Sequence, residues 1–111
     1  MTSPLPPMLD QALLARVRET VRAVEPGAQV ILYGSRARGD AEPESDWDLL
    51  VLLGGPVTAE REDAVRHRLY DLELAADVVL STLIYSRDRW DSPLYRSLPF
   101  HANVERDGVT L

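Results

Sequence analysis

The sequence contains no cysteine and no lysine, and only 6% of its residues are aromatic. Without cysteine, disulfides and thiolate metal sites are excluded. The absence of lysine suggests a genomic bias toward arginine codons, so we draw no chemistry from it. Because 18 acidic residues outnumber 12 basic ones, the formal net charge is −6. A broad nucleic-acid-binding face would need clustered positive charge and is not expected, whereas a nucleotide needs only a metal ion and a few arginines.

The chain also lacks a long apolar run. No stretch approaches the length of a membrane span, and the first residues, MTSPLPPM, have no signal-peptide pattern. We therefore expect a cytoplasmic protein that does not contact a membrane. A chain of 111 residues can bury one core but not two. Three prolines predict a flexible N-terminus over residues 1–7, and residues 8–111 are expected to form one domain.

Apolar spacing predicts two long helices, and runs of β-forming residues predict three strands. The helices are expected over Leu9–Val24 and from a cap at Thr58 to about Leu74, because apolar residues recur there every three or four positions. The strands are expected at three runs rich in β-formers: Gln29–Tyr33, Asp46–Leu53 and Asp77–Thr82.

Prolines divide the segment that follows the third strand. Pro93 and Pro99 interrupt Arg87–His101, so we expect one or two short helices there. Asn103–Leu111 is expected to hold a helical turn, ended by Gly108, and a short terminal strand. This order of elements predicts an α+β fold with two layers, in which helices pack on a small mixed β-sheet.

The run from Gly34 to Val51, GSRARGDAEPESDWDLLV, begins with a small turn. Gly34 and Ser35 directly follow the first strand, and Ser35 is expected to cap a short helix that ends at Gly39. Glycine lets a phosphate approach the backbone, and a helix N-terminus offers free N–H groups. Taken alone, the pair is more often an ordinary strand-to-helix turn, and the run contains neither a Walker loop nor a dinucleotide fingerprint.

Asp46 and Asp48 are the second feature of the run. Residues two apart on a strand point to the same face, so both carboxylates project together while Trp47 and Leu49 face the other side. Neighbouring carboxylates raise each other's pKa unless a cation lies between them, and Mg²⁺ prefers oxygen ligands. For an isolated pair, two solvated aspartates at the start of an edge strand would be the simpler interpretation.

The two features belong to one pattern: G-S-x-A-R-G, a polar loop, and S-D-x-D-L. The residues at its fixed positions are Gly34, Ser35, Ala37, Arg38, Gly39, Ser45, Asp46, Asp48 and Leu49. In this pattern, and in its strand–turn–helix–strand context, the chain resembles the minimal nucleotidyltransferases of the DNA polymerase β superfamily. The resemblance implies a nucleotidyltransferase fold over most of the chain.

The resemblance also implies a metal site with three carboxylates. Asp46 and Asp48 would hold two Mg²⁺ ions, and the family places a third carboxylate on the next strand, where Asp77 matches. Asp77 would bind the second ion and help to deprotonate the acceptor. Asp71 and Glu73 are alternatives for this position, but the helical pattern puts both on a solvated face.

The phosphates of the nucleotide would lie on the turn. The resemblance assigns them to Gly34, Ser35 and Arg38, although Arg38 is equally suited to a structural ion pair. Arg36 stands at a variable position of the pattern, and we expect it on a solvated face. His67 and His101 have no catalytic partner pattern, and His67, which lies among charged residues of a helix, is expected to be exposed.

The implied reaction is transfer of AMP from ATP to a hydroxyl with release of pyrophosphate. Single-domain members of the family are often antitoxins that adenylylate a tyrosine of a HEPN-type toxin, as in a type VII-like toxin–antitoxin pair. A binding module that blocks its partner by contact, or an enzyme that modifies a small aminoglycoside-like compound, are the alternatives. The late aromatic residues fit either a core or a partner surface.

Overall fold

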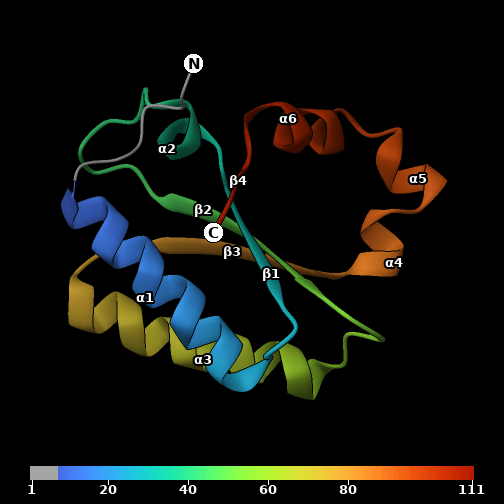
Figure 1. Ribbon diagram of the computed structural model, residues 1–111, viewed down its shortest axis with the longest axis horizontal. Coiled ribbons are helices and arrows are strands. Elements are labelled where there is room, and N and C mark those ends of the chain that lie inside the picture. Colours follow the sequence, from blue (N-terminus) through green and yellow to red (C-terminus); the bar gives the residue numbers. More distant parts are fainter. Residues whose placement is uncertain (1–7) are drawn as a thin grey trace.

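The computed structural model describes residues 8–111, so the flexibility expected for residues 1–7 lies outside the described residues. One four-stranded mixed sheet forms its centre, with the strand order β3-β2-β1-β4 (Figure 1). The strands are β1 (Gln29–Tyr33), β2 (Trp47–Leu53), β3 (Leu80–Ser86) and β4 (Val109–Thr110). β2 runs antiparallel to β1 and parallel to β3, while β4 pairs antiparallel with β1.

Two long helices cover one face of the sheet. These are α1 (Met8–Val24) and α3 (Ala59–Ala76), which lie side by side in Figure 1. Their apolar stripes meet alternate residues of the strands, as the spacing predicts. The centre of this core consists of Val17 and Val21 of α1, Val65 of α3, and Leu49, Val51 and Leu53 of β2, all fully buried. Removal of this apolar surface from water is the main force that holds the helices on the sheet.

Short helices cover part of the opposite face. They are α4 (Arg87–Trp90), α5 (Pro93–Arg96) and α6 (Pro99–Asp107), and Figure 1 shows them on the other side of the sheet from α1 and α3. Trp90 is buried there between the rings of Tyr85 and Phe100. The late aromatic residues therefore form a second, smaller core. No helix within residues 8–111 has the length and apolar character that a membrane crossing requires.

The fold class is confirmed, and the third strand is the main correction. α3 continues to Ala76, and Asp77 ends it in the left-handed conformation, with φ 56° and its N–H bonded to the Glu73 carbonyl. β3 therefore begins at Leu80 and extends to Ser86. The carboxylate of Glu73 accepts the Leu80 N–H at 2.8 Å and fixes where the strand starts. The order of elements is as predicted, but the third strand is displaced by three to four residues.

Arg61 and Glu25 form an ion pair, which we call the Glu25–Arg61 clasp, between two turns at the same end of the structure. Arg61 of α3 donates to both carboxylate oxygens of Glu25, at 2.9 and 2.7 Å, across 36 residues of sequence. It also donates to the carbonyls of Gly54 and Pro56, at 2.9 and 2.7 Å. The hydrogen bond from Arg61 lowers the pKa of Glu25. Four charge-assisted bonds from one guanidinium tie the turn after α1 to the turn after β2.

Glu25→Gln is expected to lower the free energy of unfolding by about 1–2 kcal/mol, because it removes the charge from a partly buried bidentate pair. Urea unfolding measures this loss. Since the folded state lowers the pKa of Glu25, the contribution is present at neutral pH and disappears as the pH falls through the folded pKa. Glu62→Gln, which weakens only an exposed pair with Arg66 at 3.8 Å, should change stability little. Equal losses in both variants would contradict this role of the clasp.

Candidate active site

The sheet brings the phosphate turn against the second aspartate of the pair. Tyr33, the last residue of β1, pairs with Asp48 of β2, so Gly34 follows directly beside the Asp48 side chain. Gly34 has φ 77° and ψ −158°, a combination almost restricted to glycine. A Cβ atom at this position would collide with the Asp48 carboxylate. Glycine is therefore required both by the backbone conformation and by the neighbouring carboxylate.

A single helical turn, α2 (Ser35–Arg38), follows Gly34. The N-cap is Gly34, with no side-chain cap, so the prediction that Ser35 caps this helix is wrong by one residue. Gly39 ends the turn in the left-handed conformation, as expected. The N–H groups of the first helical turn have no partner within the helix. The backbone N–H groups near Ser35 are therefore available to donate hydrogen bonds to an anion that binds beside Gly34.

The two aspartates lie at the start of β2 with their charges close together. Trp47, only 4% exposed, is buried under α1 and α3, which leaves Asp46 and Asp48 on the opposite side of the strand. Burial raises the pKa of Asp48 first, the charge of Asp46 raises it further, and Arg38 partly opposes both. A divalent cation between the carboxylates would relieve this repulsion, and their oxygens are suitable ligands for Mg²⁺.

The arginines of α2 have different roles. Arg36 bends back over the loop and donates to the carbonyls of Pro43 and Ser45, at 3.0 and 2.9 Å, with its guanidinium 4.2 Å from the centre of the Trp47 ring. The expectation of a solvated Arg36 is therefore wrong, because this side chain holds the loop that leads into the aspartates. Arg38 forms an exposed ion pair with Asp40, at 3.3 Å. No local sequence pattern distinguishes these roles.

The structure does not bring Asp77 to the pair. Asp77 is exposed at the end of α3, and within residues 11–111, whose side chains the structure describes, no three His, Asp or Glu side chains form a group able to hold a metal ion. The residue of β3 in register with Asp48 is Ser81. Of the alternatives, Asp71 is exposed and Glu73 is bonded to the start of β3. The expected carboxylate triad is a carboxylate pair here.

Tyr33 is a neighbour of the site that the sequence did not indicate. It lies beside Asp48 in the sheet, and its ring packs edge-on against Phe100 of α6, with centroids 5.2 Å apart. Burial, together with the charge of Asp48 and the nearby Tyr85, raises the pKa of Tyr33 to about 12. This hydroxyl therefore stays protonated at neutral pH and is a possible hydrogen-bond donor at the edge of the site.

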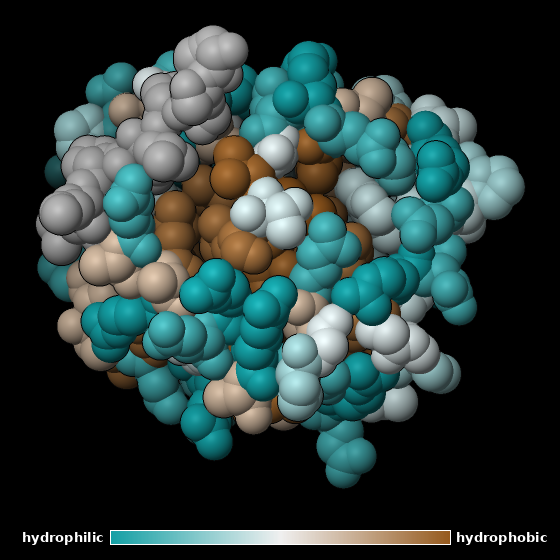
Figure 2. Space-filling model, in the orientation of Figure 1, coloured by the Kyte–Doolittle hydropathy of each residue, from teal (hydrophilic) through white to brown (hydrophobic). Residues whose placement is uncertain are grey.

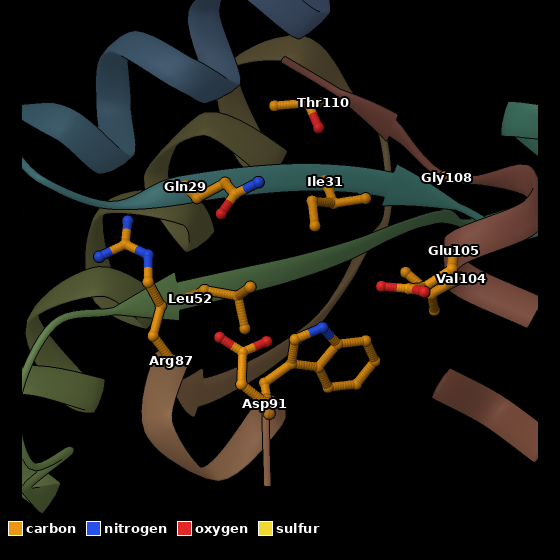
Figure 3. Close-up of a pocket in the computed structure, with 10 residues that line it drawn as sticks. Gln29, Ile31, Leu52, Arg87, Asp91, Val104, Glu105, Gly108 and Thr110 are labelled. Atoms are coloured by element: carbon orange, nitrogen blue, oxygen red, sulfur yellow. The ribbon is translucent and has the colours of Figure 1, made fainter. Parts of the chain in front are cut away.

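A cavity lies away from the aspartates. Figure 2 shows hydrophobic side chains gathered in the middle of one face, over β1 and β4. A cavity of about 340 Å³ there has Ile31 and Leu52 in its wall, with the carboxylates of Asp91 and Glu105 on opposite sides (Figure 3). It includes Gln29, at the end of β1 opposite the carboxylate pair. The structure therefore places this cavity and the aspartates at different ends of the sheet.

His101 is buried. Its ring stacks on Trp90, with centroids 4.3 Å apart, and its Nε2 has no hydrogen-bond partner among the described residues. Its position on the inner side of α6 gives it a packing role. His67 is exposed, as expected.

Comparison with known proteins agrees with this geometry. The family described as "Nucleotidyltransferase domain" matches residues 14–97. The chain therefore belongs to the nucleotidyltransferase domain family. It is also 36% identical, over 59 residues, to a provisionally named protein adenylyltransferase of Methanocaldococcus jannaschii. That match covers 53% of this chain and 60% of the relative, which is less than two thirds of its length.

A solved structure shows the same fold. A chain in the crystal structure of a toxin–antitoxin with AMP-PNP matches with a TM-score of 0.58 and 18% sequence identity. The match covers 86% of this chain and 69% of that chain. At this identity the likeness shows a shared fold, that is, the same arrangement of helices around the mixed sheet, and no more than that.

Gly34→Ala is expected to cost about 1–3 kcal/mol of stability, because alanine is strained at this positive φ and its Cβ displaces the Asp48 carboxylate. Urea unfolding measures the loss, and any affinity for Mg–ATP should fall with it. Gly27→Ala is the matched control, since no atom lies within 4 Å of its added Cβ. Equal stability of the two variants would show that the close approach of Gly34 is not restrictive.

Asp48→Asn is expected to raise the melting temperature at neutral pH. The folded state holds the Asp48 pKa above its unfolded value, so the charged carboxylate reduces stability as the pH rises through the folded pKa. The gain should shrink below the ordinary carboxyl pKa, where the carboxyl is protonated in both states. Melting curves with and without Mg²⁺ test this, because the ion should stabilise the wild type more than the variant. A lower melting temperature of Asp48→Asn at neutral pH would overturn this interpretation.

Proposed function

We propose that this chain is a nucleotidyltransferase that moves AMP from ATP to a hydroxyl and releases pyrophosphate. The observation that carries the proposal is the contact between Gly34 and Asp48, which brings the backbone of the phosphate turn directly against the carboxylate pair. Membership of the nucleotidyltransferase domain family supports it. So does the relative named as a protein adenylyltransferase, although the matched region is only part of that protein.

The residues of the turn bind the phosphates in this proposal. Gly34 lets phosphate oxygens approach the main chain, and N–H groups of the first turn of α2, with the Ser35 hydroxyl, donate to them. Arg38 is exposed and pairs only at the surface with Asp40, so its guanidinium can exchange this partner for a phosphate. Arg36 acts indirectly, because its two bonds to the loop keep the aspartates in place.

Asp46 and Asp48 are the residues that would hold Mg²⁺. Their repulsion, visible in the raised pKa of Asp48, is the feature that a cation satisfies. Bound Mg²⁺ would neutralise charge on the phosphates and lower the pKa of the attacking hydroxyl. A role for Asp77 as a third ligand, or for a second ion, would require the turn between α3 and β3 to move, so we assign the cation to the pair.

We further propose that the acceptor is a tyrosine of a HEPN-type toxin and that this chain is the antitoxin of a type VII-like pair. The resemblance of the motif to single-domain antitoxins motivates this choice. The structural neighbour supports it at the level of the fold, since it comes from a toxin–antitoxin crystal with AMP-PNP. ATP is the donor chosen for the same reasons.

Asp46→Asn is expected to abolish nucleotide transfer, because it removes one of the two carboxylates that hold the metal. The measurement is incubation of the protein with Mg²⁺ and each α-labelled nucleoside triphosphate in cell extract, followed by identification of the labelled product. Labelled AMP should appear on a small helical protein, and ATP should be the best donor. Glu42→Gln, an exposed acid of the same loop, is the matched control and should label normally. Labelling that persists in Asp46→Asn would exclude the proposed mechanism.

A binding module is the second candidate, and it is favoured because no third carboxylate joins the pair among the side chains that the structure describes. In that case the chain neutralises its partner by contact while the nucleotide site is idle. Neutralisation that survives Asp46→Asn, with no labelled product in the wild type, would select this alternative.

A further inference from the structure

The two sides of Asp48 differ in access. On the sheet face that carries its carboxylate, Asp48 lies between Tyr33 of β1 and Ser81 of β3. The Tyr33 side is closed, because its ring packs against Phe100 of α6. The Ser81 side is open, because Ser81 is exposed and β3 is the last strand of the sheet. A molecule that crosses the sheet face from a neighbouring strand therefore reaches Asp48 over Ser81 rather than over Tyr33.

The position of the phosphate turn decides which reactant uses the open side. Gly34 follows β1, so a triphosphate on this turn lies on the β1 side of Asp48. Phosphoryl transfer keeps the attacking and leaving oxygens roughly in line. We propose that the acceptor is a protein that docks along the outer edge of β3 and passes its hydroxyl over Ser81. This inference rests on the nucleotidyl transfer proposed above.

Exposed apolar side chains flank this approach. Tyr70, Leu74 and Val79, which we call the β3-edge surface, are 56%, 67% and 55% exposed. The Val79 carbonyl accepts the N–H of Trp47, at 2.9 Å, so Val79 lies next to Asp46. Large apolar residues exposed on neighbouring elements are typical of an interaction surface.

Helix α3 turns Tyr70 toward the same edge. Arg66 donates to the Thr82 carbonyl at 2.9 Å, and Glu73 accepts the Leu80 N–H at 2.8 Å, so both side chains reach β3. Tyr70 lies on the same face of the helix, four residues from Arg66 and three from Glu73. The two bonds also block part of the strand edge. The partner is therefore expected to dock through side chains rather than by adding a continuous strand.

Charge and reach define the chemistry of the partner. Glu44, Asp46 and Asp77 are exposed around the approach and favour basic side chains next to the acceptor hydroxyl. A side chain from beyond β3 must cross two strand spacings, about 9–10 Å, to reach Asp48. Serine and threonine carry the hydroxyl on Cβ and are too short, whereas tyrosine carries it at the far end of a ring. The surface fits a segment with a tyrosine and with apolar and basic neighbours.

The step balances without a further reactant. The tyrosine oxygen forms a bond to the α-phosphorus, and the bond from this phosphorus to the pyrophosphate oxygen breaks. Pyrophosphate leaves on the Gly34 side, and the hydroxyl proton passes to water on the open Ser81 side.

Ser81→Tyr tests the approach with the purified chain alone, since it places a tyrosine on the open side in register with Asp48. With Mg²⁺ and α-labelled ATP, we expect the introduced tyrosine to be labelled at least about tenfold above the wild-type background, as expected for a positioned acceptor. The label should disappear in the Ser81→Tyr/Asp46→Asn double variant. Leu94→Tyr, at a 69% exposed position on α5, is the control and should remain at background.

Calorimetric titration with Mg–ATP separates the possible failures. If Ser81→Tyr binds Mg–ATP but stays unlabelled, or if the label appears on Tyr33 at the closed side, the approach over Ser81 is wrong while the transfer proposal stands. If the wild type does not bind Mg–ATP, both proposals fail.

Val79→Glu and Leu74→Glu test the docking surface. In cell extract with α-labelled ATP, each should lower labelling of the acceptor protein at least about tenfold, since a buried charge disrupts an interface, and Leu74→Glu should do so with the affinity for Mg–ATP unchanged. Leu94→Glu introduces the same charge at the remote α5 position and should label like the wild type. Wild-type labelling by Val79→Glu and Leu74→Glu, or a selective loss in Leu94→Glu, would rule out the β3-edge surface.

Discussion

The whole candidate site depends on the close approach of the Gly34 backbone to the Asp48 carboxylate. This approach exists because Tyr33 and Asp48 are register partners in the antiparallel pair of β1 and β2. The register in turn is fixed by the core, since a slip of one residue would move Trp47 and Leu49 out of their buried positions. Because α1 and α3 bury Trp47 and Leu49 on one face, their packing fixes the register that brings Gly34 against Asp48 on the other face.

The same arrangement places two carboxylates that repel each other at the site. Burial and Asp46 both raise the pKa of Asp48, and Arg38 offsets this only in part from an exposed position. Arg36, the other arginine of the motif, is used to hold the loop and stacks on Trp47. The chain therefore leaves negative charge uncompensated where a cation and a nucleotide would meet, while the Glu25–Arg61 clasp and the cores supply stability elsewhere.

The sequence was sufficient for the local features and insufficient for the long-range ones. Apolar spacing located α1, β1 and α3 closely, and the positive φ at Gly34 follows from a glycine between strand and helix. The sequence places the start of the third strand too early because β-formers follow Asp77 directly, whereas the carboxylate of Glu73 fixes the first residue of β3. The roles of Arg36 and His101 depend on partners distant in sequence, which no periodicity reveals.

The displaced strand also changes the surroundings of Asp48. With Asp77 at the end of α3, the position beside Asp48 on β3 belongs to Ser81, a small residue without charge. An acidic residue there would add a third carboxylate beside the pair and cover the exposed strand edge next to Asp48. Ser81 adds no charge and leaves this edge accessible. The boundary between α3 and β3 therefore sets both the number of carboxylates beside Asp48 and the access to it across β3.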